Sequence, residues 1–439
     1  MIKLRSLALI LLAVLAWPLV AHATDVKKVV SPGGIEAWLV SEESIPLVTM
    51  VVAFDGGARR DPNGKEGLSV ITAGLLNEGA GDMDAQAFKR RLDEKAIRFS
   101  ADSDRDAVFI TLGTLVENSG EAFELVRLAL TETRFDPDAV ERVRAQLQAI
   151  LKREAEDPET IAARAWNAEV LSGHPYGRSE NGSAQSVTAV TRDDILAYDK
   201  DNLTRDRIKI AVVGRITAEE LAPALDKMFG ALPATSTPET TPMAELKVQG
   251  HTTLIARDIP QSVVAFGAPG LLRKDPDYDA AQVMNYILGG GGFASRLMDE
   301  VREKRGLAYG ISTALSPLRF GGLYVGQVGT DNAKAGQSLE LIKSEIKRLG
   351  SEGPTQQEVD DAKTFLTGSF ALRLDSNAKI ANFLLACQIY DLGIDYINIR
   401  NQGIEKVTID DVKRVAARLL DPGKFAFTVV GKPQGITSN

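Results

Sequence analysis

The feature that most constrains this fold is an order of predicted elements that occurs twice. Hydrophobic periodicity predicts strands, then helices, then a closing strand in the first half of the chain, and the same order restarts in the second half. The two closing strands, IKIAVVGRI at residues 208–216 and FAFTVVGKP at residues 425–433, are similar in sequence. The sequence therefore predicts an internal duplication of an α+β unit.

A break in composition separates the two halves. Residues 232–247, LPATSTPETTPMAELK, combine three prolines with Ser and Thr and show no apolar periodicity, which is typical of a linker. We therefore expect a first domain at residues 24–231, a linker at residues 232–250 and a second domain at residues 251–439.

The N-terminus is typical of a secretory signal peptide. Lys3 and Arg5 precede an apolar run at residues 7–17, and the small residues Ala21 and Ala23 frame a cleavage site. We expect cleavage after Ala23 and no membrane attachment afterwards. The alternative is an uncleaved anchor, although the run is short for a membrane span.

Composition excludes some functions. The chain has 439 residues, of which 59 are acidic and 51 basic, so its net charge of −8 gives no electrostatic footprint for nucleic acid. Its single cysteine, Cys387, excludes an intrachain disulfide and lies in an apolar run at residues 383–387. We expect a buried small hydrophobe there and not a nucleophile, because no histidine follows it in the chain.

Residues 288–309, LGGGGFASRLMDEVREKRGLAY, carry the most informative local pattern. The glycines at residues 289–292 interrupt a helical pattern, as a hinge or as a site of close helix packing. A second helix then resumes, ends at Gly306 and leads into a strand from Leu307. Its apolar face would contain Phe293, Leu297, Met298 and Val301.

Arg302 and Tyr309 flank this predicted helix-to-strand turn. A tight turn folds the strand back beside the helix, so a guanidinium and a phenol could point at one place. The alternative is that Arg302 only complements the helix dipole and Tyr309 only packs on a sheet.

The run SRLMDEVREKRGLAY, residues 295–309, resembles the C-terminal-half signature of the pitrilysin/insulinase metallopeptidase family, whose zinc motif is HxxEH. The resemblance covers nearly all of the chain after residue 23. It implies a duplicated two-domain chain, a half clamshell in which each domain is a mostly antiparallel sheet covered by helices. It also implies that Arg302 and Tyr309 are the family's Arg/Tyr pair, which lies across the cleft from zinc, binds substrate and stabilises the oxyanion.

The first half departs from the family pattern at the zinc motif. Aligned on the Gly-Leu-Ser at residues 67–69, the ligand and base positions hold Val70, Ala73 and Gly74, which can neither bind zinc nor move a proton. The third ligand would fall at residues 148–151, QAIL, and the nearby carboxylates are out of register. These are Glu154 and Glu156.

Only two histidines follow the predicted signal peptide, and neither belongs to a zinc motif. His174 lies in an HPYG segment that also resembles the family, and we expect a loop histidine held by local hydrogen bonds. His251 opens a predicted strand, where we expect it to be exposed. A self-contained zinc peptidase is therefore not expected, and no metal is expected in this chain.

The resemblance and the signal peptide together favour a zinc-free subunit of a periplasmic heterodimeric metallopeptidase. A homologous HxxEH partner would supply zinc and the general base, and Arg302 and Tyr309 would act in trans on a peptide or unfolded protein. An alternative is a catalytically inert peptide-binding or assembly subunit with the same fold. A third hypothesis, an active homodimer with unconventional ligands, conflicts with the scarcity of histidine.

Overall fold

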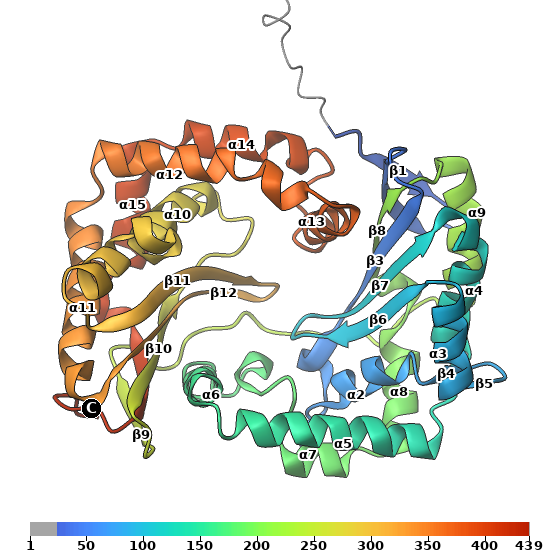
Figure 1. The fold of residues 1–439 in the computed structure, drawn as a ribbon, viewed down its shortest axis with the longest axis horizontal. Helices are drawn as coiled ribbons and strands as arrows, with labels where there is room; N and C mark the ends of the chain where they lie inside the picture. Colours follow the sequence, from blue (N-terminus) through green and yellow to red (C-terminus); the bar gives the residue numbers. More distant parts are fainter. Residues whose placement is uncertain (1–23, 439) are drawn as a thin grey trace, which may run out of the picture.

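Two β-sheets, each covered by helices, make up the two halves of the chain (Figure 1). The structure is a computed structural model that describes residues 24–438. The predicted signal peptide, residues 1–23, lies outside the described residues. Within residues 24–438, no helix combines the length and the apolar character that a membrane crossing requires.

The first half contains a six-stranded sheet, a two-stranded ribbon and eight α-helices. Its strands are β1 Lys27–Val30, β2 Glu36–Ser41, β3 Leu47–Asp55, β6 Arg98–Ser103, β7 Ala107–Leu115 and β8 Ile208–Gly214, with β4 Gly79–Ala80 and β5 Met83–Asp84 as the ribbon. Its helices are α2 Leu68–Leu75, α3 Ala85–Glu94, α4 Ser119–Thr131, α5 Pro137–Glu154, α6 Pro158–Val170, α7 Ala184–Ala189, α8 Arg192–Asn202 and α9 Ala218–Phe229.

The second half contains a five-stranded sheet and six α-helices. Its strands are β9 Thr252–Ala256, β10 Gln261–Pro269, β11 Ala308–Leu318, β12 Gly321–Asp331 and β13 Ala426–Gly431. Its helices are α10 Tyr278–Asn285, α11 Ala335–Glu352, α12 Gln356–Gly368, α13 Asn377–Ile389, α14 Tyr396–Lys406 and α15 Ile409–Leu419, with π-helical turns at Tyr286–Gly290 and Met298–Glu303.

The two sheets share one strand order. The first runs β1-β2-β8-β3-β7-β6 and the second β9-β13-β10-β12-β11. In each sheet the closing strand pairs in parallel with a strand from the start of its half, β2 with β8 and β9 with β13, and all other neighbours are antiparallel. Apart from β1, the orders correspond strand for strand. The predicted α+β class, the duplication and the mostly antiparallel sheets are confirmed.

Each half also contributes one helix to the sheet of the other half. Helix α6, from the first half, packs on β10 and β13, whereas α13, from the second half, packs on β3 and β8 (Figure 1). Each donated helix makes one side-chain hydrogen bond to the closing strand that it covers. Trp166 Nε1 donates to the Ala426 carbonyl at 3.0 Å, and Gln388 Nε2 donates to the Ile210 carbonyl at 2.8 Å.

This exchange explains why the closing strands are apolar on both faces. In β8, Ile210 and Val212 face the core of their own half, and Ala211 and Val213 face α13. A strand that is covered on both faces loses the alternation of polar and apolar residues. Cys387 lies on α13 in the same contact and is 1% exposed, as predicted. Burial raises the pKa of its thiol to about 12.

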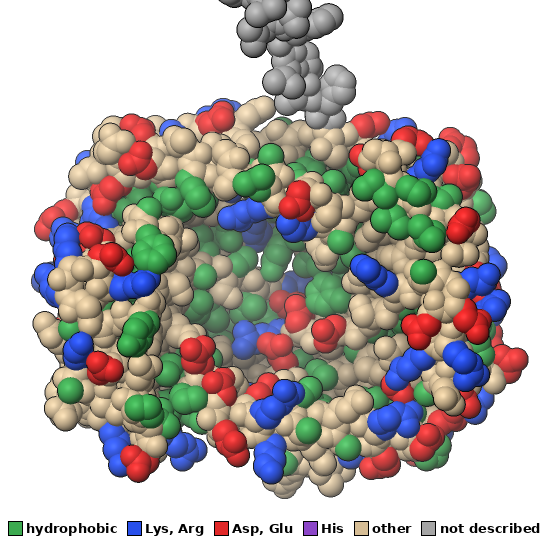
Figure 2. All heavy atoms as spheres, in the orientation of Figure 1, with side chains coloured by type: hydrophobic (Ala, Val, Ile, Leu, Met, Phe, Trp, Pro, Cys, Tyr) green, Lys and Arg blue, Asp and Glu red, His purple; other side chains and the backbone are tan. Residues whose placement is uncertain are grey.

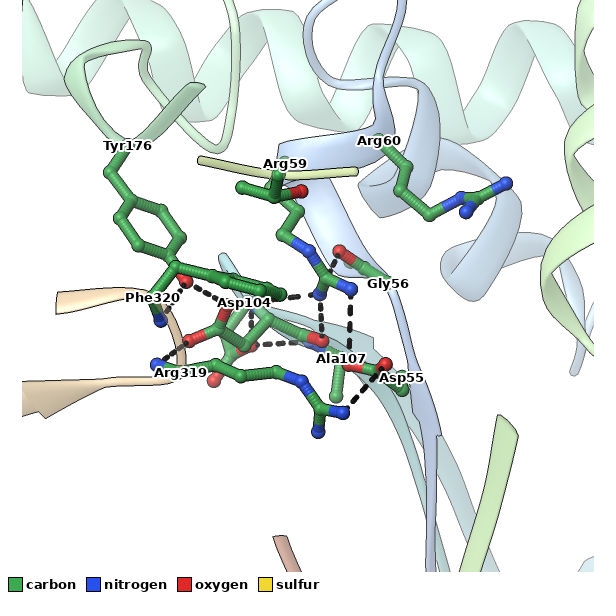
Figure 3. Close-up of polar contacts among 12 residues, drawn as sticks. Asp55, Gly56, Arg59, Arg60, Asp104, Ala107, Tyr176, Arg319 and Phe320 are labelled. Carbon is green, nitrogen blue, oxygen red and sulfur yellow. Dashed lines mark hydrogen bonds and ion pairs between the residues drawn. The ribbon is translucent and has the colours of Figure 1, made fainter. Parts of the chain in front are cut away.

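A polar junction near the middle of the molecule joins the halves a second time (Figure 3). The tip of the β11–β12 hairpin reaches the first half, where the Arg319 backbone N–H donates to Asp106 Oδ2 at 3.1 Å and the Phe320 N–H donates to the Tyr176 hydroxyl at 3.2 Å. Tyr176 in turn donates to Asp106, and burial beside this carboxylate raises the pKa of Tyr176. The phenol therefore stays protonated and remains a donor.

The connection between the halves has no regular helix or strand at residues 233–250, but it is fastened along its length. Thr237 N–H donates to Asp201 Oδ1 at 2.7 Å, Glu239 accepts from Arg60 Nη1 at 2.9 Å, and Lys247 N–H donates to the Val170 carbonyl at 2.7 Å. The exact domain boundaries stay a prediction.

Candidate functional site

The helix that would carry the zinc motif, α2, is packed where ligands would stand. Ala73 is 1% exposed, and Val70 packs against the same core. A Cβ atom added at Gly74 would lie 3.1 Å from Val143 Cγ1 on α5, which is a closer contact than ordinary packing. A side chain at this position would therefore require Val143 to move.

The predicted region of the third ligand is equally unsuited. Within residues 148–151, Leu151 is buried in the same core as Ala73, and Gln148 turns away to hydrogen-bond Thr188 Oγ1 at 3.1 Å. Glu154 pairs with Arg164 and accepts from Asn181 Nδ2 at 2.8 Å, and Glu156 is exposed. Among residues 24–438, no group of three or more His, Cys, Asp or Glu side chains is placed to hold a metal ion.

Both histidines have structural partners. His174 is buried; its Nδ1 accepts from the Tyr176 N–H at 3.1 Å, and its Nε2 lies 3.0 Å from the Pro242 carbonyl, so Nε2 carries the proton. The predicted local hydrogen bond is therefore present, together with one to the connecting segment. His251 is only half-buried and lies 3.3 Å from Glu169 Oε1, so the expectation of a merely exposed histidine was incomplete.

The glycine run is largely a site of close packing. Helix α10 continues as a π-helical turn that ends at Gly290. A Cβ atom added to any of the first three glycines, residues 289–291, would overlap a neighbouring atom. At Gly289, for example, a Cβ would lie 2.6 Å from Thr313 Oγ1 of β11. The fourth glycine, Gly292, has open space around it and a φ of 57°, so it supplies the left-handed turn that ends the segment.

The predicted turn between helix and strand is present. The Gly306 N–H donates to the Arg302 carbonyl at 2.8 Å and the Leu307 N–H to the Val301 carbonyl at 2.9 Å, with Gly306 at a φ of 57°. The two bonds span four and six residues, each one residue more than in a Schellman motif, because the helix ends in the π-helical turn Met298–Glu303.

Tyr309 occupies a β-bulge just after this turn. Its neighbours Ala308 and Gly310 pair with Thr330 and Gly329 of β12, while Tyr309 itself has no partner in the ladder. Bulges redirect side chains, and the Tyr309 side chain is 79% exposed.

Arg302 and Tyr309 line one pocket of about 330 Å³ on the second half of the molecule. No hydrogen bond joins either side-chain polar group to another described residue, and the nearest carboxylate oxygen to Arg302 Nε is Glu303 Oε1, at 3.6 Å. The structure thus brings the pair to one place with free donors. The pocket is lined by Arg302, Glu303, Gly306, Leu307, Ala308, Tyr309, Thr330, Asp331 and Lys334.

One prediction about this segment was wrong. Leu297, Met298 and Val301 are buried as predicted, but Phe293 is 65% exposed. The turn at Gly292 and the extended backbone of Ser295 separate Phe293 from the helix that follows, so it does not share that helix's apolar face. Its ring instead lies under the Arg302 guanidinium, 4.6 Å from ring centroid to Cζ.

The face shown in Figure 2 is hollowed at its centre, between the halves. Two pockets there combine residues of both halves, one of about 330 Å³ and one of about 270 Å³. The first lies between Phe109 of β7 and Tyr390 after α13, and the second between Trp166 of α6 and Thr313 of β11.

Comparison with known proteins identifies the family. Residues 38–182 match the family described as insulinase (peptidase family M16), and residues 189–366 match the one described as peptidase M16 inactive domain. A non-peptidase homolog, YmxG, of Helicobacter pylori is 26% identical, over 88% of this chain and 89% of its own length. A probable mitochondrial-processing peptidase subunit beta of Schizosaccharomyces pombe is 27% identical, over 88% of this chain and 87% of its own.

A solved structure supports the same assignment. The peptidase M16 inactive domain from Pseudomonas fluorescens matches with a TM-score of 0.88 and 26% identity, covering 94% of this chain and 99% of that chain. The duplicated sheets, the degenerate zinc positions on α2 and these matches agree: this chain belongs to the M16 (pitrilysin/insulinase) peptidase family, in a form that resembles its inactive members.

Proposed function

We propose that this protein is the zinc-free subunit of a periplasmic heterodimeric metallopeptidase, which supplies Arg302 and Tyr309 to the active site of a homologous HxxEH subunit. One observation carries the proposal. Tyr309 is exposed and Arg302 is half-buried, the two share a pocket, and neither side chain has a hydrogen-bond partner among residues 24–438, whereas the zinc positions of the same chain hold Val70, Ala73 and Gly74, which offer no ligand.

The chemistry of the pair suits a developing negative charge. Hydrolysis of a peptide bond passes through a tetrahedral oxyanion, which a guanidinium and a phenol can stabilise by donating hydrogen bonds. Arg302 remains charged at any physiological pH, and the Tyr309 hydroxyl is free to reorient. The partner's zinc and carboxylate would provide the activated water, because residues 24–438 contain no cluster of side chains that fits a metal ion.

The hollow between the halves supports a peptide or unfolded protein as substrate. Pockets lined by both halves offer apolar and charged groups side by side, as an extended peptide requires. The name of the yeast relative describes a peptidase subunit and that of the bacterial relative a non-peptidase, which together favour a chain that acts with a partner. The periplasmic location rests on the predicted signal peptide alone.

The test is reconstitution with a purified HxxEH homologue from the same cell. Peptide hydrolysis and bound zinc are measured for each chain alone and for the mixture. Only the mixture should be active, and Arg302→Ala or Tyr309→Phe should lower its rate roughly 100- to 1000-fold. Arg305→Ala is the matched control, because Arg305 ends the same helix but pairs with Glu300.

Two outcomes would contradict the proposal. Hydrolysis by the isolated chain with stoichiometric zinc would make it a peptidase in its own right. A mixture that binds peptide without cleaving it would favour the second candidate, an inert peptide-binding or assembly subunit, which the match to the inactive M16 domain also supports.

A further inference from the structure

Phe293 is exposed in a way that needs a reason. It stands at the end of the glycine run, 65% exposed, on a backbone that is firmly fixed. Ser295 is fully buried, and both its N–H and its hydroxyl donate to the Gly292 carbonyl, at 3.0 Å and 2.7 Å. The chain thus builds a rigid turn that holds a large apolar ring in solvent.

The ring has one neighbour of functional interest. The Arg302 guanidinium lies over it at 4.6 Å, within the range of a cation–π contact. Stacking uses the flat face of a guanidinium and leaves its N–H groups, which point outward in the plane, free to donate. A carboxylate in place of the ring would fix the guanidinium as well, but it would occupy those donors and cancel part of the charge.

The other cation–π contacts of the described chain provide an internal comparison. Arg59 lies over Phe320 at 5.1 Å, yet it is 5% exposed and donates to the carbonyls of Gly56 and Asp106. Arg400, over Phe370 at 4.7 Å, is also 5% exposed and donates to the Leu366 carbonyl. Arg273, over Tyr278 at 4.2 Å, donates to the Tyr396 hydroxyl, and Arg319, over Phe320 at 5.9 Å, pairs with Asp55 Oδ2 of the other half at 3.3 Å. Within residues 24–438, the Arg302 guanidinium donates no hydrogen bond, and its one ion-pair partner is Glu303, the next residue in the chain, at 3.6 Å. The stacking of Arg302 therefore does not tie it to another element of the fold through polar contacts.

We propose that Phe293 is a positioning residue for Arg302: its ring fixes the guanidinium beside Tyr309 while leaving the N–H donors free for an oxygen of the substrate. The inference deepens the proposed function and rests on it. The ligand of the Phe293–Arg302–Tyr309 unit is a carbonyl or carboxylate oxygen of a peptide, which a planar pair of N–H donors and one phenol can bind together.

Kinetics of the reconstituted pair test this role. Phe293→Leu keeps an apolar side chain but removes the aromatic face, and it should lower kcat about fivefold to tenfold with a smaller change in KM. Phe293→Tyr restores the ring and should restore kcat. In an Arg302→Ala background, Phe293→Leu should have no further effect. An equal loss in that background would mean that Phe293 contacts the substrate itself, and it would overturn the proposal.

A spectroscopic measurement separates this inference from the proposed function. In the isolated chain, the ring current of Phe293 should shift the NMR signal of the Arg302 Nε–H group upfield, with Arg302→Lys used for assignment. The shift should disappear in Phe293→Leu and persist in Phe293→Tyr. An unchanged signal in Phe293→Leu would overturn the positioning role even where the mixture is active. The expected shift in a chain whose mixture is inactive would keep the contact and reject the proposed function.

Discussion

Helices α2 and α10 hold equivalent places in the two halves, yet one is packed and the other leads to an exposed site. Each follows the corresponding sheet strand, β3 or β10, and each packs against a corresponding pair of helices, α5 and α8 or α12 and α15. Around α2 the core is filled by small and aliphatic residues, such as Ala73 of α2 and Leu151 of α5. After α10 the chain passes through a π-helical turn and displays Phe293, Arg302 and Tyr309.

The difference shows that the fold of a half requires neither a zinc site on its first long helix nor an Arg/Tyr site after it. The same strand order forms around a packed helix in one half and around an interrupted helix in the other. Capping boxes and apolar stripes follow the usual sequence preferences of helices and strands, and they form the fold that both halves share. An exposed Phe or a Tyr in a β-bulge departs from those preferences and marks where one half has a further role.

The largest effect on stability is expected from restoring the zinc motif on α2, which tests the contrast between α2 and α10. Val70→His, Ala73→Glu and Gly74→His together place a carboxylate at a fully buried position and a side chain against Val143. We expect a loss of at least about 4 kcal/mol in the free energy of unfolding and no zinc binding, because residues 148–151, where the third ligand would fall, contain no acidic side chain. Urea denaturation and metal analysis check this.

For the restored motif, Val70→His alone is the milder control, because Val70 is only half-buried and the single change places no carboxylate at Ala73 and no side chain against Val143. Stable folding of the triple variant with bound zinc would show that the first half is a latent metal site, and it would remove the contrast between α2 and α10.

The second largest effect on stability is expected at the contact between α6 and the sheet of the second half. Trp166→Ala removes a nearly buried indole and its hydrogen bond to the Ala426 carbonyl. We expect a loss of about 3 to 5 kcal/mol in the free energy of unfolding. Trp166→Phe, which keeps most of the volume, should cost less. Differential scanning calorimetry should record one transition for both halves, and two separate transitions would contradict a shared core.

The pH dependence of stability gives a further comparison, because α8 contains a half-buried aspartate whose Oδ1 is shielded from solvent. Capping boxes begin α8 at Thr191 and α15 at Thr408, and the matching positions further on hold Asp199 and Ala416. Ala416 is fully buried and apolar, whereas burial raises the pKa of Asp199 to about 7, with its Oδ1 lacking a hydrogen-bond partner. The folded state therefore holds a proton that the unfolded state releases near pH 4.

The contribution of Asp199 to the free energy of unfolding should consequently fall as the pH rises from about 4 to about 7, and then stay level. Asp199→Ala should abolish this part of the pH dependence, with a gain of about 2 kcal/mol at pH 8 and little change at pH 4. Unfolding curves of both proteins across this range measure the difference. A gain that is independent of pH would mean that Asp199 is ionised in the folded protein.

The smallest effect on stability is expected at Arg302, which is half-buried, and at Tyr309, which is exposed. Arg302→Ala and Tyr309→Phe should change the free energy of unfolding by less than about 0.5 kcal/mol, because neither side chain is buried or hydrogen-bonded within the described chain. Thermal denaturation checks this. A large loss would assign the pair a structural role and weaken its assignment to catalysis.

Much of the frame could be predicted from sequence because its signals are local. Apolar runs predicted the two closing strands near their observed bounds, and the glycine at Gly306 predicted the turn that leads into β11. Strand β1 and helices α7 and α14 were missed, since their short or mixed patterns carry weak periodicity.

The exchange of helices could not be predicted, because an apolar stripe does not say which sheet it will cover. The junction around Arg59, Tyr176 and Phe320 was missed for a related reason: its charged residues lie in segments that look like ordinary solvated loops. For the site, spacing and resemblance gave Arg302 and Tyr309, but the exposure of Phe293 depends on a turn at Gly292 that a helical pattern conceals.

The exchange of α6 and α13 also determines what happens when the backbone is cut. Cleavage within the exposed part of residues 233–250 would leave two polypeptides, each of which contributes a helix to a sheet of the other. Such a nick should be visible on a denaturing gel and invisible by gel filtration, and either fragment expressed alone would lack the helix that covers one face of its sheet. The two halves repeat one unit, yet each depends on the other to bury a face of its sheet.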